Sequence, residues 1–215
     1  MKGYTPMTTI TAHAGALNTP ENTEESLRAC LAFVGPGIVE VDLRFSRAGI
    51  PVLAHHAPAP KDALSLEDCF RLAQGFGAHF NLDLKESRGD LGAVRELIER
   101  YNMKERAFFT GLRGAGHIRA VRGCGIPWYL NATAPHWLPF AASLMALRAK
   151  ALGAVGLNLS FRFCNPAVMR AARKHGLLVS VWTVDSRADM ARMLRLGVDN
   201  ITTRHPDVLK EMLNS

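Results

Sequence analysis

The sequence contains no long apolar run. No stretch approaches the roughly 18 consecutive apolar residues that a membrane-spanning helix needs. The first residues, MKGYTPMTT, also lack the apolar core of a secretory signal. We therefore expect a cytoplasmic protein with no stable membrane association.

Cysteine is scarce, and its spacing excludes the usual metal and redox motifs. The four cysteines are Cys30, Cys69, Cys124 and Cys164. They form no CxxC pair and have no Cys–His metal spacing, so we expect buried free thiols.

Acidic residues are outnumbered by basic ones, 19 to 26, which gives a net charge of +7. This charge suits an anionic partner. The basic residues are nevertheless dispersed, and no compact basic run alternates with aromatic residues, so we expect no nucleic-acid groove. The expected partner is a small, negatively charged substrate, and the oligomeric state stays open.

Short apolar or β-branched segments alternate with helical segments along the whole chain. The expected strands are 8–12, 38–43, 79–85, 107–110, 128–132, 155–159, 178–184 and 200–203. Eight such units favour an α/β fold, a (β/α)₈ TIM barrel, built as one domain over residues 1–215. An open doubly wound sheet is the alternative, but no GxGxxG motif follows the first strand.

Capping patterns mark several helix starts. The expected caps are Asn22 with Glu25, Ser65 with Asp68, Asn165 with Pro166, and Ser186 with Asp189. One element breaks the alternation: residues 46–50 indicate a turn and 51–56 a further strand. So short a connection predicts a small hairpin after the second strand, which would place His55 over the barrel mouth.

Charged residues alternate with apolar ones on two of the strands. Glu40, Asp42 and Arg44 share one face of the second strand. The next strand repeats the pattern with Asp83 and Lys85. We expect the charged faces to point into the barrel near its C-terminal mouth.

Three carboxylates in one mouth repel one another unless a cation neutralises them. Oxygen ligands favour a hard divalent ion such as Mg²⁺, Ca²⁺ or Mn²⁺. The alternative is a structural network in which Glu40 and Asp42 pair with Arg44 and Lys85. Beside the acids, His13 ends the first strand and His55 ends the hairpin. Two such histidines can share the roles of general base and general acid across one scissile bond, and the alternative is that each is a structural group.

These residues resemble the glycerophosphodiester phosphodiesterase family, within the phosphatidylinositol-phospholipase-C-like barrels. The matching segments are HAG at 13–15, PENT at 20–23, EVD at 40–42, HH at 55–56, NLDLK at 81–85, WTV at 182–184 and GVDNI at 197–201. They occur in the family's order across nearly the whole chain.

The resemblance implies a function and a set of roles. It implies metal-dependent hydrolysis of a glycerophosphodiester to an alcohol and a phosphomonoester. Glu40, Asp42 and Asp83 would hold one divalent cation, Mg²⁺ or Ca²⁺, while His13 and His55 transfer protons. Lys85 would contact a phosphate oxygen, Trp182 would face the alcohol or simply pack in the barrel, and Asn22 would contact substrate or cap a helix.

The sequence also departs from the family pattern. Ala14 replaces an arginine that would contact phosphate, and Arg44 is a candidate to supply the missing charge. Asp83 replaces a glutamate and His56 an aspartate. Arg204-His205 replaces an Asp-Arg pair, and the segment after His56 is short. Two alternatives follow: a degenerate barrel that binds a phosphorylated ligand, and a phospholipase-D-toxin-like lyase that forms a cyclic phosphate.

Overall fold

The computed structural model describes residues 8–86, 89–112, 114–132 and 140–214. The strands are β1 (Thr9–Ala12), β2 (Ile38–Phe45), β3 (Pro51–Leu53), β4 (His79–Leu84), β5 (Ala107–Leu112), β6 (Trp128–Asn131), β7 (Gly156–Ser160), β8 (Leu178–Trp182) and β9 (Asn200–Thr203). The helices are α1 (Glu24–Val34), α2 (Leu66–Leu72), α3 (Leu91–Arg100), α4 (Ala115–Arg122), α5 (Ala141–Leu152), α6 (Pro166–Lys174), α7 (Arg187–Leu196) and α8 (Pro206–Asn214), with a 3₁₀ turn η1 (Phe161–Phe163).

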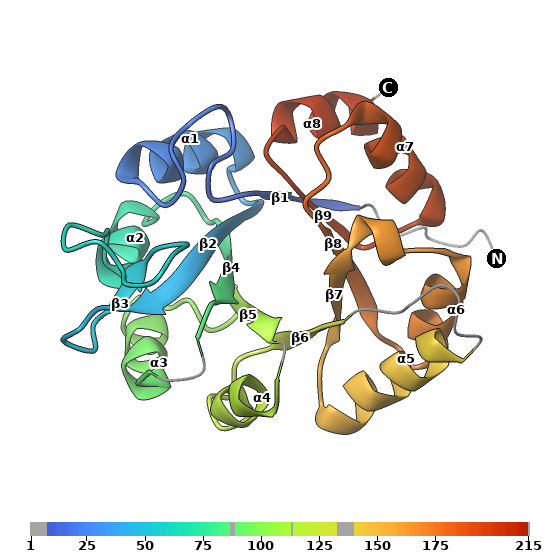
Figure 1. Cartoon of the computed structure of the whole chain (residues 1–215). Coiled ribbons are helices and arrows are strands. Elements are labelled where there is room, and N and C mark those ends of the chain that lie inside the picture. The colour runs from blue at the N-terminus through green and yellow to red at the C-terminus, as the bar shows by residue number, and fades with distance from the viewer. Residues whose placement is uncertain (1–7, 87–88, 113, 133–139, 215) are drawn as a thin grey trace.

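The parallel strands close into a barrel. β1 pairs with β2 on one side and with β9 on the other, in parallel register on both. The remaining parallel strands follow in chain order between them. Figure 1 shows the helices as a ring around the strands. The predicted (β/α)₈ barrel is therefore confirmed, and the open doubly wound alternative is excluded by closure.

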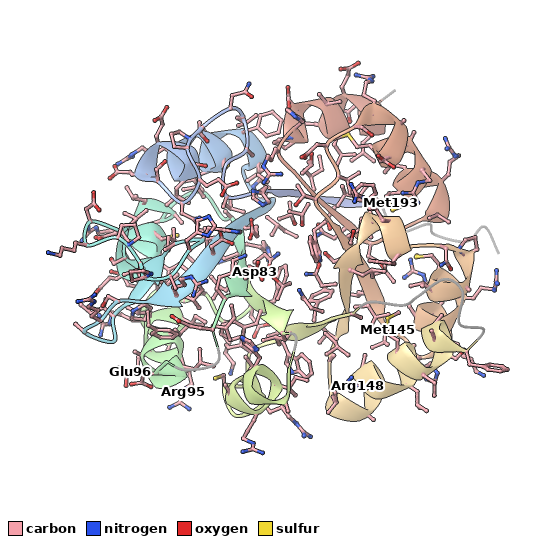
Figure 2. The ribbon with its side chains drawn as sticks, in the orientation of Figure 1. Asp83, Arg95, Glu96, Met145, Arg148 and Met193 are labelled. Atoms are coloured by element: carbon pink, nitrogen blue, oxygen red, sulfur yellow. The ribbon has the colours of Figure 1, made fainter. Side chains whose placement is uncertain are left out.

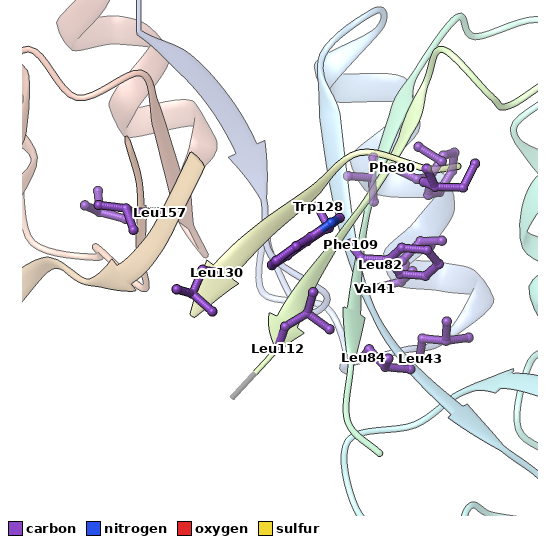
Figure 3. Close-up of a cluster of buried hydrophobic side chains, with 14 of the residues drawn as sticks. Val41, Leu43, Phe80, Leu82, Leu84, Phe109, Leu112, Trp128, Leu130 and Leu157 are labelled. Atoms are coloured by element: carbon purple, nitrogen blue, oxygen red, sulfur yellow. The ribbon is translucent and has the colours of Figure 1, made fainter. Parts of the chain in front are cut away.

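The apolar core lies between the strands and the ring of helices. On β2, Val41 and Leu43 are buried on the face opposite Glu40 and Asp42. Figure 3 shows these two side chains in one cluster with apolar residues of β4, β5 and β6. The period-2 pattern of the strands thus separates a helix-facing apolar surface from a polar barrel interior.

Helix starts follow the capping residues of the sequence with one exception. The hydroxyls of Ser65 and Ser186 and the amide oxygen of Asn165 cap α2, α7 and α6 as expected. For α1, however, Thr23 is the cap and accepts from the backbone N–H of Ser26. The expected cap Asn22 is wrong, because its side chain bonds to β2 instead.

The hairpin after the second strand is present but shorter than expected. β3 pairs antiparallel with the end of β2 and stops at Leu53, whereas a strand to residue 56 was expected. The backbone bends after Ala54, ahead of Pro58 and Pro60, which lack the N–H that a ladder requires. The bend carries His55 to the mouth of the barrel, as predicted.

No helix in the described ranges has both the length and the hydropathy that a bilayer crossing requires. The cysteines are free thiols, as expected. Cys30, Cys69 and Cys164 are buried and Cys124 is half-buried.

Candidate active site

A cavity of about 190 Å³ opens at the C-terminal end of the barrel. It is lined by His13, Glu40, His55, Asn81, Asp83, Lys85, Thr110, Asn131, Asn158, Trp182, Thr183, Thr202 and Arg204. Figure 2 shows Asp83 near the centre of the ring, whereas Arg95, Glu96 and Arg148 lie on outer helices. This is the end of a (β/α)₈ barrel at which catalytic residues gather.

Three carboxylates converge there, as the strand pattern predicted. Asp42 and Asp83 are direct neighbours in the β2–β4 register, and Glu40 lies two residues earlier on the same face of β2. One oxygen from each of these three side chains lies within 4.8 Å of the others. The set therefore offers convergent oxygen ligands of the kind that hard divalent cations prefer.

Lys85 neutralises only part of this charge. Its ammonium lies 2.6 Å from Oδ1 of Asp42 and also pairs with Asp83. Burial alone would lower the pKa of Lys85, but these two carboxylates raise it above its usual value. When ionised, the three acids and one ammonium leave two negative charges uncompensated in the cluster.

The repulsion among the three carboxylates affects the pKa of Glu40. Its side chain is buried, and Oε2 accepts a hydrogen bond of 3.0 Å from the backbone N–H of Ala14. Burial, with the neighbouring charges of Asp42 and Asp83, raises the pKa of Glu40 well above its usual range. A divalent cation at this point would remove the repulsion, so the residues present fit such an ion.

Asp42 is held ionised. Burial alone would raise its pKa, but the Lys85 ammonium and hydrogen bonds from Lys85 and Asn22 lower it below its usual value. Asp42 and Lys85 therefore form the ion pair that the sequence suggested as part of a structural network.

Arg44, in contrast, does not pair with Glu40 or Asp42 as that network would require. Its guanidinium donates through Nε and Nη2 to the backbone carbonyl of His55, at 3.1 and 3.0 Å. It also faces Glu86 at 3.5 Å, and it does not line the cavity. Arg44 thus braces the segment that carries His55 and does not supply charge to the cavity.

His13 follows β1 directly and faces Glu40 through Nε2, at 3.9 Å. Its Nδ1 accepts from the backbone N–H of Gly15 at 3.4 Å. Burial, together with the nearby charge of Arg204, lowers the pKa of His13, so the neutral ring is favoured. In the neutral ring, an acceptor Nδ1 places the proton on Nε2.

His55 has the opposite arrangement. Its Nδ1 lies 2.9 Å from Oδ2 of Asp42. Because Asp42 is held ionised and can only accept, Nδ1 carries the proton in neutral His55 and Nε2 is left with its lone pair. In their neutral forms, His13 thus offers an N–H donor at Nε2 and His55 offers an acceptor lone pair at Nε2.

Asn22 supports the acid cluster and does not line the cavity. Its Nδ2 donates to Oδ2 of Asp42 at 2.8 Å, and its Oδ1 accepts from the Asp42 backbone N–H at 3.0 Å. Asn22 holds a left-handed backbone, with φ of 59°, which asparagine tolerates better than most residues. These contacts position Asp42, and the substrate role expected for Asn22 stays a prediction.

Trp182 lines the half of the barrel away from the acids. In the ring of strands, β7 and β8 lie opposite β2 and β4. Trp182 Nε1, Asn158 Oδ1 and Thr202 Oγ1 are buried there without a hydrogen-bond partner among the described residues. Sequence reasoning missed this polar half, although the inward-facing Asn158 alternates with buried leucines on β7.

The role of Gly111 could not be predicted from the sequence. The structure shows it through a positive φ of 81°, a backbone conformation that favours glycine. A Cβ at this position would lie 2.4 Å from Oδ1 of Asp83 and 2.4 Å from the carbonyl oxygen of Leu84. The glycine therefore permits the Asp83 side chain to occupy its place in the cluster.

We expect Gly111→Ala to lower the melting temperature and to weaken divalent-ion binding, because the new methyl group displaces Asp83. The strained backbone alone costs roughly 1 kcal/mol or more. Gly123→Ala is the matched control, since that glycine has negative φ and open space around its Cβ position. Calorimetric titration with Mg²⁺ and thermal unfolding measure both effects, and wild-type affinity in Gly111→Ala would contradict the expectation.

Comparisons with known proteins found similar chains and a similar family. A model of the glycerophosphoryl diester phosphodiesterase family matches residues 128–208. The glycerophosphodiester phosphodiesterase of Caldanaerobacter subterraneus subsp. tengcongensis is 24% identical over an alignment of 252 residues, which covers 94% of this chain and 96% of that protein.

Two solved structures have the same barrel. A candidate glycerophosphodiester phosphodiesterase from Galdieria sulphuraria has a TM-score of 0.83 at 24% identity, covering 97% of this chain and 98% of that one. An Oleispira antarctica phosphodiesterase, solved in complex with the product sn-glycerol-3-phosphate, has a TM-score of 0.81 at 17% identity, with 97% and 98% coverage. At such identities these structures support the fold. The ordered motifs, the family match over residues 128–208 and the relative aligned along nearly the whole chain together make this protein similar to the glycerophosphoryl diester phosphodiesterase family.

Proposed function

We propose that the protein hydrolyses glycerophosphodiesters to an alcohol and a phosphomonoester, with a divalent cation and two histidines. The observation that carries the proposal is the pair of imidazoles beside the acid cluster. His13 and His55 line the same cavity, His13 with its Nε2 at 3.9 Å from Glu40 and His55 with a lone pair at Nε2. General acid–base catalysis of a diester cleavage requires these two groups.

Glu40, Asp42 and Asp83 would hold one divalent cation, either Mg²⁺ or Ca²⁺, with Mn²⁺ also compatible with oxygen ligands. When bound, such an ion supplies Lewis-acid polarisation of a phosphoryl oxygen. Asp42 serves two partners in this arrangement, because Oδ2 orients His55 while Oδ1 lies toward Lys85. Asn22 holds that carboxylate in place through both ends of its amide.

The proton transfers use Nε2 of both rings. His55 enters the step neutral, and its Nε2 removes a proton from the attacking water, whose oxygen forms a new bond to phosphorus. His13 enters the step as the imidazolium, and its Nε2 gives a proton to the alcohol oxygen as the bond from that oxygen to phosphorus breaks, which leaves His13 neutral. The products are one alcohol and one phosphomonoester, and the two rings exchange protonation states in the process.

Lys85 and Trp182 are proposed to contact the substrate. Lys85 lines the cavity beside the acids, where its ammonium suits a phosphoryl oxygen. Trp182 lines the opposite side, where its ring offers a wall to the alcohol portion. We further propose that the chain acts as one domain, 1–215, on a small diester in the cytoplasm, without nucleic acid or stable membrane contact, in keeping with its dispersed basic residues.

A panel of glycerophosphodiesters, incubated with Mg²⁺ or Ca²⁺ and with a chelator, tests the proposal. We expect cation-dependent release of alcohol, which the chelator stops and added cation restores. Phosphorus NMR identifies the product as an open phosphomonoester. A cyclic phosphate as end product would indicate the lyase alternative, and intact diesters after prolonged incubation with every cation would indicate a barrel that only binds.

A further inference from the structure

We propose that Arg204 is the arginine that binds the phosphoryl group in this protein. The inference rests on the proposed function, because it concerns the anion that the cavity accepts. It starts from a shortage of cations. Position 14 carries a buried alanine, and Arg44 lies outside the cavity. Lys85 is shared by two carboxylates.

Arg204 lines the cavity and follows β9 directly. β9 pairs with β1, so that Ala12 lies opposite Thr203, and the backbone N–H of His13 donates to the Thr203 carbonyl at 3.0 Å. Arg204 therefore follows a strand end that lies beside His13, the histidine proposed as the general acid. Its charge also contributes, after burial, to the lowered pKa of His13.

Two carboxylates hold the guanidinium in place. Nη1 lies 3.2 Å from Asp185 and Nη2 lies 3.1 Å from Glu21. These two ion pairs use two of the five N–H donors of an arginine. The remaining donors belong to a planar group whose geometry matches phosphate oxygens. The two ion pairs thus orient the guanidinium of Arg204 before an anion arrives, which reduces the conformational entropy lost when the anion binds.

The alternative is that Arg204 acts only as a latch, a residue whose two ion pairs hold two corners of the barrel together. Arg204 joins Glu21 in the β1–α1 corner to Asp185 in the β8–α7 corner, and it could serve stability alone. A latch predicts loss of stability without a specific loss of anion affinity. Binding of the phosphoryl group predicts the loss of affinity whatever happens to stability.

The test is a titration of the Mg²⁺-loaded protein with inorganic phosphate and with glycerol 3-phosphate, followed by calorimetry or phosphorus NMR. We expect Arg204→Gln, which keeps a hydrogen-bond donor without the charge, to weaken both affinities about 10- to 100-fold. Arg204→Lys keeps the charge but not the fork, and we expect a weakening of about 5- to 10-fold. Arg28→Ala removes an exposed arginine that pairs with Glu24 on α1, and it should stay within twofold of wild type.

A second readout separates contact from folding. Free guanidinium at millimolar concentration should restore part of the diesterase activity of Arg204→Gln and leave Arg28→Ala unchanged. Arg204→Gln with phosphate affinity within twofold of Arg28→Ala would overturn the assignment, as would a wild type that binds neither anion. If the wild type binds phosphate through Arg204 yet cleaves no diester, the proposed function fails while the assignment of Arg204 stands.

Discussion

Glu40→Gln is expected to abolish cation-dependent activity and, at the same time, to stabilise the protein without divalent cation. The amide keeps an acceptor for the Ala14 N–H but removes the negative charge that Asp42 and Asp83 repel. Loss of one ligand to the ion should lower kcat/KM by about 10³-fold, equivalent to about 4 kcal/mol of transition-state stabilisation.

The effect on stability has the opposite sign. A carboxyl group whose pKa is raised on folding destabilises the folded state at a pH above its unfolded pKa, because ionisation is easier in the unfolded chain. At pH 7 without divalent ions, the amide should therefore raise the free energy of unfolding. The stabilisation that wild type gains from Mg²⁺ should be lost.

Glu96→Gln is the matched control, because Glu96 is an exposed glutamate on α3 and lies outside the cluster. It should change neither kcat/KM nor the response to Mg²⁺. Thermal unfolding with and without Mg²⁺, combined with diester kinetics, measures both effects. An active Glu40→Gln protein, or one that Mg²⁺ still stabilises as it does wild type, would refute Glu40 as a ligand.

His13→Ala is expected to lower kcat by about 10²- to 10⁴-fold on diesters with an alkyl alcohol. The reason is that the Nε2 proton of the His13 imidazolium is the one proposed to neutralise the departing alkoxide. A nitrophenyl phosphodiester has a leaving group that needs no proton. On that substrate His13→Ala should lose little activity, whereas His55→Ala should lose activity on both substrates.

The comparison of the two substrates makes the assignment of roles testable. His175→Ala is the control, since His175 follows α6 at the opposite end of the barrel from the cavity. If the nitrophenyl substrate rescues His55→Ala and not His13→Ala, the acid and the base have exchanged roles. Equal losses for both variants on both substrates would indicate that neither ring protonates the leaving group.

Local sequence patterns predicted the barrel and the acid cluster well, because both follow from alternation along single strands. Glu40 and Asp42 face the interior while Val41 faces the helices, and this depends only on the period of a strand. The parallel register of β2 and β4 then places Asp83 beside Asp42. Two neighbouring strands of one barrel need little further information to bring their inward side chains together.

The side-chain contacts of Asn22 and Arg44 were harder to predict from the sequence, because each depends on a partner elsewhere in the chain. Asn22 matches the pattern of a helix cap, yet it bonds to Asp42 across 20 positions, and Thr23 caps the helix. The guanidinium of Arg44 donates to the backbone carbonyl of His55, which the short hairpin places nearby. No local pattern distinguishes these outcomes.

The sequence by itself thus determined the fold, the converging carboxylates and the two histidines, because strand periodicity and the order of the motifs are properties of short segments. Only the tertiary structure decided which proton each imidazole carries and which arginine faces the cavity. Those two results depend on hydrogen bonds of His13 and His55 to particular groups, and on closure of the barrel between β1 and β9, which places Arg204 next to His13. Such contacts form only once distant parts of the chain are held together.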